Sequence, residues 1–156
     1  MMIVYFLITG IILSVSVYLV DRSYTAVSNF TTKDKVPVSC KVQNHLGDTE
    51  AKIRKKYPTK TFKVEYSDDG YRYITTDFEY GIVSFLFSKD TGIVIVCAQV
   101  PYNDTALNIL INYYNIRYKI ISKNAWEERV SDGKIIIELK NDVDYNRLDF
   151  HYRFIK

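Results

Sequence analysis

The stretch that decides the fold is residues 79–100, which read Glu-Tyr-Gly-Ile-Val-Ser-Phe-Leu-Phe-Ser-Lys-Asp-Thr-Gly-Ile-Val-Ile-Val-Cys-Ala-Gln-Val. Two apolar runs, 82–87 and 93–100, flank a turn that contains Gly92. The runs are rich in β-branched and aromatic residues and too short for ordinary helices, which predicts a β-hairpin. Because both runs are apolar on both faces, we expect this hairpin at the centre of a sheet with something packed over it.

The hairpin belongs to a helix-and-strand pattern that occurs twice in residues 45–156. Asp48 and Asp104 are good caps for two helices, over 48–56 and 106–114. Alternating strands are expected at 61–66, 71–77, 116–120, 126–131, 134–140 and 147–154, with Asp-Gly turns at 69–70 and 132–133. A shift of 56 positions aligns the two helices and the strands after them, which indicates a duplication into halves 45–100 and 101–156.

These elements predict an α+β domain of two layers, in which two helices cover one face of an antiparallel sheet of about eight strands. The second helix places Leu107, Leu110, Ile111 and Tyr114 on one face, and that face should cover the central hairpin. At the level of topology, this arrangement resembles the tandem helix-plus-four-strand arrangement of the β-lactamase-inhibitor-protein fold. The resemblance is to a fold, and it implies no activity.

Residues 1–20 carry no charged side chain, and about twenty apolar residues span a bilayer as a helix. They predict a transmembrane anchor, and a serine- and threonine-rich tether comes next over 21–44. The alternative is a cleaved signal peptide, with Ser14 and Ser16 as the small residues before the cut. No Lys or Arg precedes the apolar run, and apolar residues continue past that cut to Val20, which favours the uncleaved anchor.

Two opposing observations bear on the side of the membrane. Arg22, Lys33 and Lys35 come after the apolar segment, and the positive-inside rule would then keep the domain in the cytoplasm. Amino-terminal anchors commonly export the domain attached to them, so we expect a single-pass protein whose domain lies on the external or periplasmic side. Secretion after signal cleavage and a cytoplasmic-facing domain are the alternatives.

Composition narrows the classes of partner. The net charge is only +3, and a nucleic-acid-binding domain usually has a more basic, clustered face, so no nucleic acid is expected. Cys40 and Cys97 match no metal spacing, and the two histidines cannot complete a zinc site. We therefore predict no metal and no cofactor. Cys97 should be a buried packing residue, and a Cys40–Cys97 disulfide is the alternative if the domain is exported.

No catalytic motif occurs in the sequence: it has no phosphate loop, no Gly-x-Gly-x-x-Gly, no His-Glu-x-x-His and no Gly-x-Ser-x-Gly. His45 precedes the first helix and is expected in its cap, while His151 alternates outward on the last strand. These observations predict a protein that is not an enzyme.

The polar face of the sheet is the candidate site, because broad faces with Tyr and Arg suit protein recognition. Its members are Lys63, Glu65, Arg117, Lys119, Lys134, Glu138, Arg147, His151 and Arg153. We predict a membrane-anchored or exported, non-enzymatic protein-binding domain with an envelope-associated, inhibitor or immunity-type role. The alternatives are a merely solvated face and a tethered domain that binds a small ligand or lipid in a pocket between helices and sheet.

Overall fold

Eight strands and two α-helices build residues 37–156, the part of the chain that the computed structural model describes. The 3-10 turns η1 (Val38–Cys40) and η2 (Val42–His45) precede the helices α2 (Glu50–Lys56) and α3 (Asp104–Arg117). The strands are β1 (Lys63–Tyr66), β2 (Arg72–Phe78), β3 (Gly81–Phe87), β4 (Val94–Pro101), β5 (Lys119–Ser122), β6 (Ala125–Val130), β7 (Gly133–Asp142) and β8 (Arg147–Ile155). The predicted anchor over 1–20 lies outside the described residues, and within 37–156 no helix has the length and apolarity to cross a membrane.

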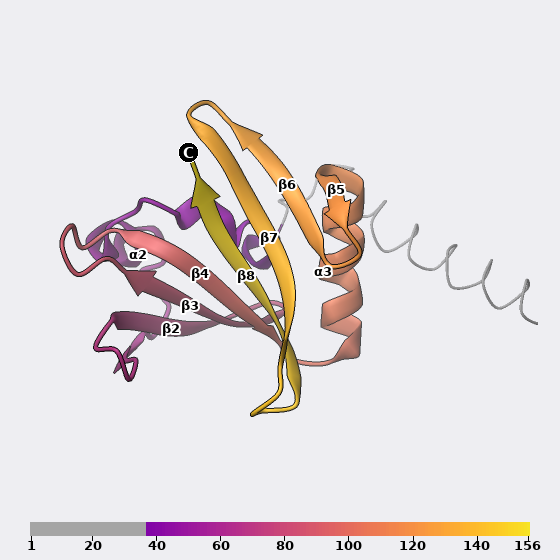
Figure 1. Cartoon of the computed structure of the whole chain (residues 1–156). Helices are drawn as coiled ribbons and strands as arrows, with labels where there is room; N and C mark the ends of the chain where they lie inside the picture. The colour runs from indigo at the N-terminus through magenta and orange to yellow at the C-terminus, as the bar shows by residue number, and fades with distance from the viewer. Residues whose placement is uncertain (1–36) are drawn as a thin grey trace, which may run out of the picture. The chain divides into compact units, whose positions relative to one another are not determined.

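All strands join one antiparallel sheet in the order β1-β2-β3-β4-β8-β7-β6-β5. Each helix leads into a four-strand meander, and the pairing of β4 with β8 joins the two meanders at the centre of the sheet (Figure 1). The predicted α+β class, with an antiparallel sheet and two helices, is confirmed. The strands β1 and β5 begin at Lys63 and Lys119, which are the residues that the internal shift aligns.

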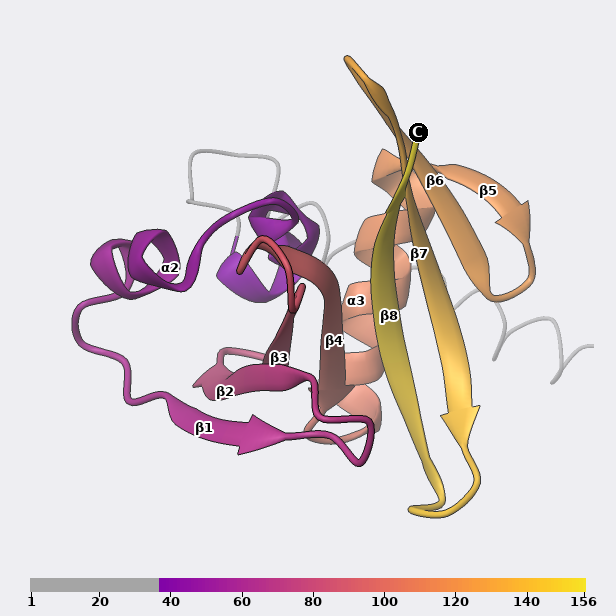
Figure 2. The same cartoon turned by 60° about the vertical axis from the view of Figure 1, so that its left-hand side comes forward.

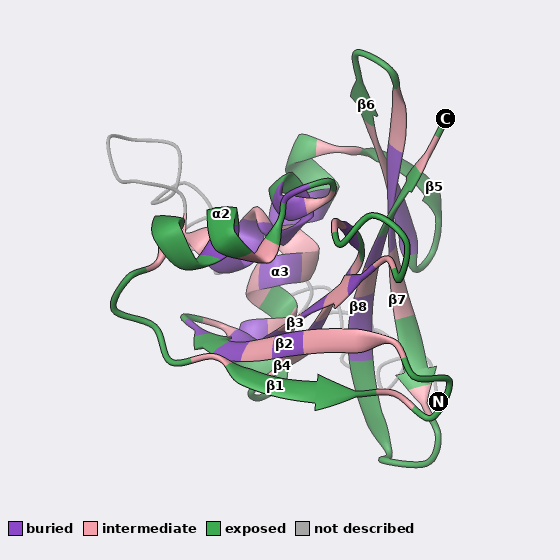
Figure 3. Ribbon diagram, turned by 90° about the vertical axis from the view of Figure 1, so that its left-hand side faces the viewer, coloured by how far each residue is buried: buried purple, intermediate pink, exposed green. Residues whose placement is uncertain are grey.

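The sheet has a covered face and an open face. On the covered face Phe85, Cys97 and Tyr152 are neighbours across β3, β4 and β8, and Tyr114 of α3 contacts the ring of Tyr152. The segment that leads to α2 lies on the same face, because His45 meets Phe85 edge to face at 5.3 Å. Buried residues gather between these elements and the sheet (Figure 3). The alternate residues of each strand form the open face, which neither α2 nor α3 covers.

The helix ends differ from the predicted ones. Thr49 and Asn103 are the N-caps, and their side-chain oxygens accept hydrogen bonds from the Lys52 and Ala106 backbone N–H groups. α3 continues to Arg117, so the strand expected over 116–120 starts only at Lys119. Of the apolar residues at 116, 118 and 120, Ile116 lies in α3 and Ile120 lies in β5. Alternation over so few residues fits a helix as well as a strand, so the sequence did not separate the two.

The central hairpin forms as predicted, and Gly92 takes the left-handed conformation of its turn with φ +66°. The residues packed over it come mainly from the first half of the domain, since His45 covers Phe85 and Cys97 Sγ donates to the Val42 carbonyl at 3.5 Å. α3 lies along β4 and β8 (Figure 2), where Leu110, Tyr113 and Tyr114 are its large buried residues. Leu107 and Ile111, expected on the same face, are only half-buried.

Two further segments differ from their sequence-based expectation. β1 is exposed along its whole length instead of half-buried, because it is an edge strand and its apolar residues Val64 and Tyr66, on the covered side of the sheet, meet no second layer. Residues 37–44, which the sequence assigns to the tether, form η1 and part of η2 within the unit Pro37–Lys156. Cys40 and Val42 there are fully buried, so this segment contributes to the core.

Candidate functional site

Eight of the nine residues predicted for the polar sheet face lie on the open face of the sheet. Their registers place them there: Lys63 and Glu65 pair with Thr75 and Tyr73 at one edge, and the others lie on β5, β7 and β8. The eight are Lys63, Glu65, Lys119, Lys134, Glu138, Arg147, His151 and Arg153. The ninth, Arg117, is in the last turn of α3, with its guanidinium 5.9 Å from the Tyr113 ring centroid, and does not belong to the sheet.

Ion pairs connect the charged side chains of β5, β6, β7 and β8 on the open face, and we call this part the charged half. Arg153 donates to Glu138 at 3.3 Å, and the Lys140 ammonium lies 3.7 Å from the same carboxylate. Lys119, Arg129 and Lys134 surround Glu127, and these three cations hold the pKa of Glu127 below its usual value against the effect of burial. These five cations share two carboxylates, so this part of the face stays net positive with Glu127 and Glu138 embedded in it.

His151 lies among these charges on the open face, opposite Glu138 on β7 and Ala98 on β4. Its burial, followed by the nearby Lys140 ammonium, lowers the pKa of the imidazole. Because its pKa is lowered, the imidazole is neutral at pH 7. His151 therefore adds no positive charge to the open face.

The other half of the open face carries an apolar strip on β3 and β4. The strip consists of Ile82, Leu86, Val96, Ala98 and Val100, which the strand register places on one face. Ile82 has 41% of its surface exposed, and the other four are half-buried. The sequence predicts that something packs over this hairpin, and among the described residues that cover lies on the other face, over Phe85 and Cys97.

The apolar strip ends in a groove of about 490 Å³. Ile82, Ser84 and Val100 lie at the groove, Lys63 and Glu65 line it from β1, and Arg147 lines it from the start of β8. The Arg147 guanidinium donates to Asp149 at 3.1 Å and lies 4.8 Å from the ring centroid of exposed Tyr145. The groove thus combines an apolar surface with fixed charges of both signs and a nearby tyrosine.

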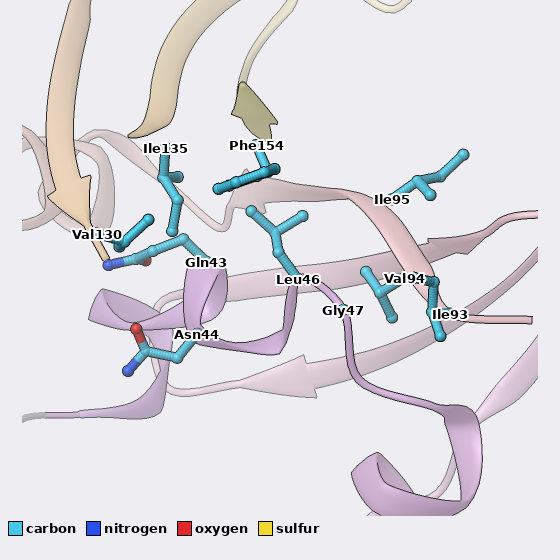
Figure 4. Close-up of a pocket in the computed structure, with 10 residues that line it drawn as sticks. All are labelled: Gln43, Asn44, Leu46, Gly47, Ile93, Val94, Ile95, Val130, Ile135 and Phe154. Carbon is cyan, nitrogen blue, oxygen red and sulfur yellow. The ribbon is translucent and has the colours of Figure 1, made fainter. Parts of the chain in front are cut away.

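A separate apolar pocket of about 610 Å³ lies between the η2 segment and the ends of β4, β6, β7 and β8 (Figure 4). Gln43 is the buried polar residue among those that line it, and we call it the Gln43 pocket. Its lining is Gln43, Asn44, Leu46, Gly47, Ile93, Val94, Ile95, Val130, Ile135 and Phe154. Sequence reasoning missed these residues, because they come from five segments that only the folded chain brings together.

His45 is the centre of a buried polar cluster beneath α2. Its Nδ1 lies 2.9 Å from Asp48 Oδ2, and its Nε2 lies 2.8 Å from the Tyr57 hydroxyl. Burial lowers the pKa of His45, so the neutral imidazole donates to Asp48 and accepts from Tyr57. Burial opposes ionisation of Asp48, but Lys52 and His45 together hold the pKa of its carboxyl below the usual value. With only 1% of His45 exposed, the cluster holds the start of α2 against the sheet and offers no access to a substrate.

The two thiols are free in the structure. Cys40 and Cys97 are both fully buried, and burial raises the pKa of Cys40 to about 12 and raises that of Cys97. Such thiols are protonated at neutral pH and act as packing residues. Among the described residues, no three His, Cys, Asp or Glu side chains are grouped closely enough to hold a metal ion.

Comparisons of the chain with protein-family models, with curated proteins and with solved structures found no match. The resemblance to the β-lactamase-inhibitor-protein fold therefore rests on the order of helices and strands alone. Any functional conclusion has to come from the chemistry of the open face and of the Gln43 pocket.

Proposed function

We propose that residues 37–156 form a non-enzymatic domain that binds another protein through the open face of its sheet. Such a domain would serve an envelope-associated assembly or act as an inhibitor or immunity-type protein. The observation that carries the proposal is the apolar strip on β3 and β4, which lies uncovered at the centre of the sheet with charged residues on both sides.

The strip and its surroundings have the composition of a protein interface. Burying apolar surface contributes about 25 cal/mol per Å², so a partner that covers Ile82 and its neighbours gains free energy. An interface typically has an apolar centre and a polar rim, with Tyr and Arg among the residues that contribute most. Here Lys63 and Glu65 of β1 lie on one side of the strip. Arg147 of β8 lies on the other side, and Tyr145 lies beside it.

The groove also indicates the chemistry of the partner. Its charged groups include Lys63 and Arg147 as cations and Glu65 and Asp77 as carboxylates, and its aliphatic lining residues are Ile82 and Val100. A projecting loop fits this arrangement if it carries an apolar side chain at its tip and charges of both signs beside it. Charge complementarity of this kind would select the partner and its orientation more than it would add affinity.

The experiment is affinity capture of the partner with the tagged full chain and matched variants. Lys63→Glu combined with Tyr145→Ala alters one exposed side chain of the open face and one in the turn between β7 and β8 beside the groove, and exposed substitutions usually change stability by less than about 0.5 kcal/mol. Tyr is enriched among the interface residues whose truncation costs more than about 1 kcal/mol, so we expect recovery of the partner to fall about fivefold or more.

Arg117→Glu is the matched control, because Arg117 is also exposed but lies on α3, away from the open face. Recovery of the partner should be unchanged in this variant. Equal recovery from the double variant, or a greater loss from Arg117→Glu, would contradict the proposal. Circular dichroism of each variant establishes that the fold is retained.

We also propose that residues 1–20 attach this domain to a membrane, on the external or periplasmic side. The support is the absence of charged side chains over a length that spans a bilayer. Alkaline carbonate extraction should leave the full chain in the membrane fraction, and protease should digest the domain in cells whose outer envelope has been opened while the cytoplasmic membrane stays intact. Release into the soluble fraction, or protection from the protease, would contradict attachment or sidedness respectively.

A further inference from the structure

Strand β1 forms an open edge of the sheet. It pairs with β2 on one side, and among the described residues no strand pairs with its other side (Figure 2). All four of its residues are exposed, including Val64 at 45% and Tyr66 at 65%. A free edge presents unpaired backbone N–H and C=O groups that another strand can bind. The register of β1 with β2 is regular over all four residues, so this edge has the geometry of a strand throughout.

The ladder with β2 determines which backbone groups of β1 face outward. The Ser67 N–H, just after β1, donates to the Tyr71 carbonyl at 2.9 Å. Backbone groups point alternately to the two sides of an antiparallel strand, so residues 63, 65 and 67 turn theirs toward β2. The N–H and C=O groups of Val64 and Tyr66 therefore face the open edge.

The sequence of β1 is complementary to itself in one antiparallel register. If two copies pair about a twofold axis at Val64, Lys63 of each copy lies opposite Glu65 of the other. Val64 lies opposite Val64, and the outward groups of these two residues exchange both backbone hydrogen bonds. The Lys63 and Glu65 positions then form non-hydrogen-bonded pairs, in which side chains lie closer and opposite charges stabilise the strand pair.

Other symmetric registers of β1 lack this complementarity. A twofold axis at Lys63 would place two ammonium groups opposite each other, and an axis at Glu65 would place two carboxylates opposite each other. Like charges directly opposite destabilise a strand pair. A shift by one residue would pair side chains that lie on opposite faces of the sheet. The charge pattern of β1 therefore selects the register centred on Val64.

The edge at the other end of the sheet, β5, offers no such match. Its pairing with β6 has a register shift between Ile120 and Ser122, and irregularities of this kind protect an edge against another strand. A twofold axis at Ile121 would also bring Lys119 opposite Lys123 of the other copy. Of the two edges, β1 is therefore the one suited to pairing with itself.

We propose that two copies of this chain form a dimer by pairing their β1 strands antiparallel, centred on Val64. Residues opposite each other in paired strands face the same side of a sheet, so the dimer has one continuous sheet with two open faces side by side. The apolar strip on β3 and β4 stays uncovered in each copy. The dimer therefore stands or falls independently of the protein-binding proposal.

The test is oxidative disulfide cross-linking of the full chain with copper phenanthroline. Val64→Cys places one thiol of each copy beside the twofold axis, where Cα atoms lie about 5.5 Å apart, within the range of a disulfide. Cys40 and Cys97 are fully buried and do not compete for the oxidant. We expect a covalent dimer of the Val64→Cys chain that a reducing agent converts back to the monomer.

Two control variants report the edge and the register. Ile121→Cys lies on β5 at a matched exposure of 44%, and Tyr66→Cys lies on β1 but about 13 Å from its symmetry mate in this register. Both should cross-link at least about fivefold more slowly than Val64→Cys. An equal rate for Ile121→Cys would overturn the edge, and an equal rate for Tyr66→Cys would overturn the register. An adduct of the Val64→Cys chain with a different protein, in place of the dimer, would overturn the second copy as the occupant.

Charge reversal in the Val64→Cys chain tests the ion pairs themselves. Glu65→Lys brings two cations opposite each other at both symmetric positions and should slow cross-linking about threefold or more. Adding Lys63→Glu restores unlike charges and should restore the rate. A slow rate that persists in the doubly reversed chain would contradict the pairing of Lys63 with Glu65.

Discussion

The buried polar side chains of this domain form hydrogen bonds with residues from other segments of the chain. His45, Gln43 and Gln99 are all almost fully buried, and each makes hydrogen bonds inside the core, although Gln43 Oε1 and Gln99 Nε2 have no partner among the described residues. The sequence places His45 before a helix, but nothing in it indicates the Tyr57 hydroxyl on its other nitrogen. Burial and partner choice of this kind depend on contacts between segments, which a sequence pattern does not contain.

The buried imidazole makes a prediction about pH. The pKa of His45 is lowered in the folded protein, so below about pH 6.5 the unfolded chain binds a proton that the folded chain resists. Stability should therefore fall as the pH decreases from 7.5 to 5.5, by at most about 1.4 kcal/mol per pH unit from this group. Urea unfolding of the full chain at both pH values measures the fall.

Histidine variants separate the contributions to this pH dependence. His151 also has a lowered pKa, so His151→Gln should flatten the dependence in part, and the double variant with His45→Gln should flatten it further. Stability that increases towards pH 5.5 in the unmodified chain would contradict the neutral state assigned to His45.

At the scale of elements, α3 is held on the sheet by Tyr114. Its ring contacts Trp126 and Phe150 at centroid distances of 5.6 and 5.3 Å, and its hydroxyl lies 2.7 Å from that of Tyr152. Tyr152 in turn donates to Gln99 Oε1 at 2.8 Å, which leaves the Tyr114 hydroxyl as the donor between the two rings. Tyr114 thus connects α3 directly with β6 and β8, and through Tyr152 with β4.

Two substitutions at Tyr114 should separate the hydroxyl from the ring. Tyr114→Phe removes one buried hydrogen bond and should lower the free energy of unfolding by about 1 kcal/mol. Tyr114→Ala also removes the ring and should cost about 3 to 5 kcal/mol, as large-to-small core substitutions do. Urea denaturation measures both. Equal losses in the two variants would show that ring packing is not what holds α3.

Elements were predictable from sequence where their pattern is long or sharply ended. Two β-rich runs and a glycine turn predict the hairpin of β3 and β4, and alternation with Asp132-Gly133 predicts the meander of β6, β7 and β8. The end of α3 was not predictable, because Ile116 and Tyr118 fit a helix and a strand equally well. The 3-10 turns before α2 were missed because they have no periodic pattern.

At the scale of the whole molecule, the two meanders meet at β4 and β8 and leave one broad face of the sheet without a helix over it. The alternation of charges in β7 and β8 predicted which residues form that face. It did not predict the groove, because no sequence pattern indicates that Arg147 of β8 lies near Lys63 and Glu65 of β1. Candidate site residues were therefore predictable as a set, while their arrangement was not.

The central claim, that the open face binds a protein, is tested most directly by placing a photoreactive p-benzoylphenylalanine at single positions of the full chain in cells. Thr75 lines the groove on the open face, and Ile116 is exposed on α3, away from it. We predict a discrete adduct with one partner protein from position 75 and no such adduct from position 116. Adducts from position 116 alone, or the same adducts from both positions, would contradict the claim.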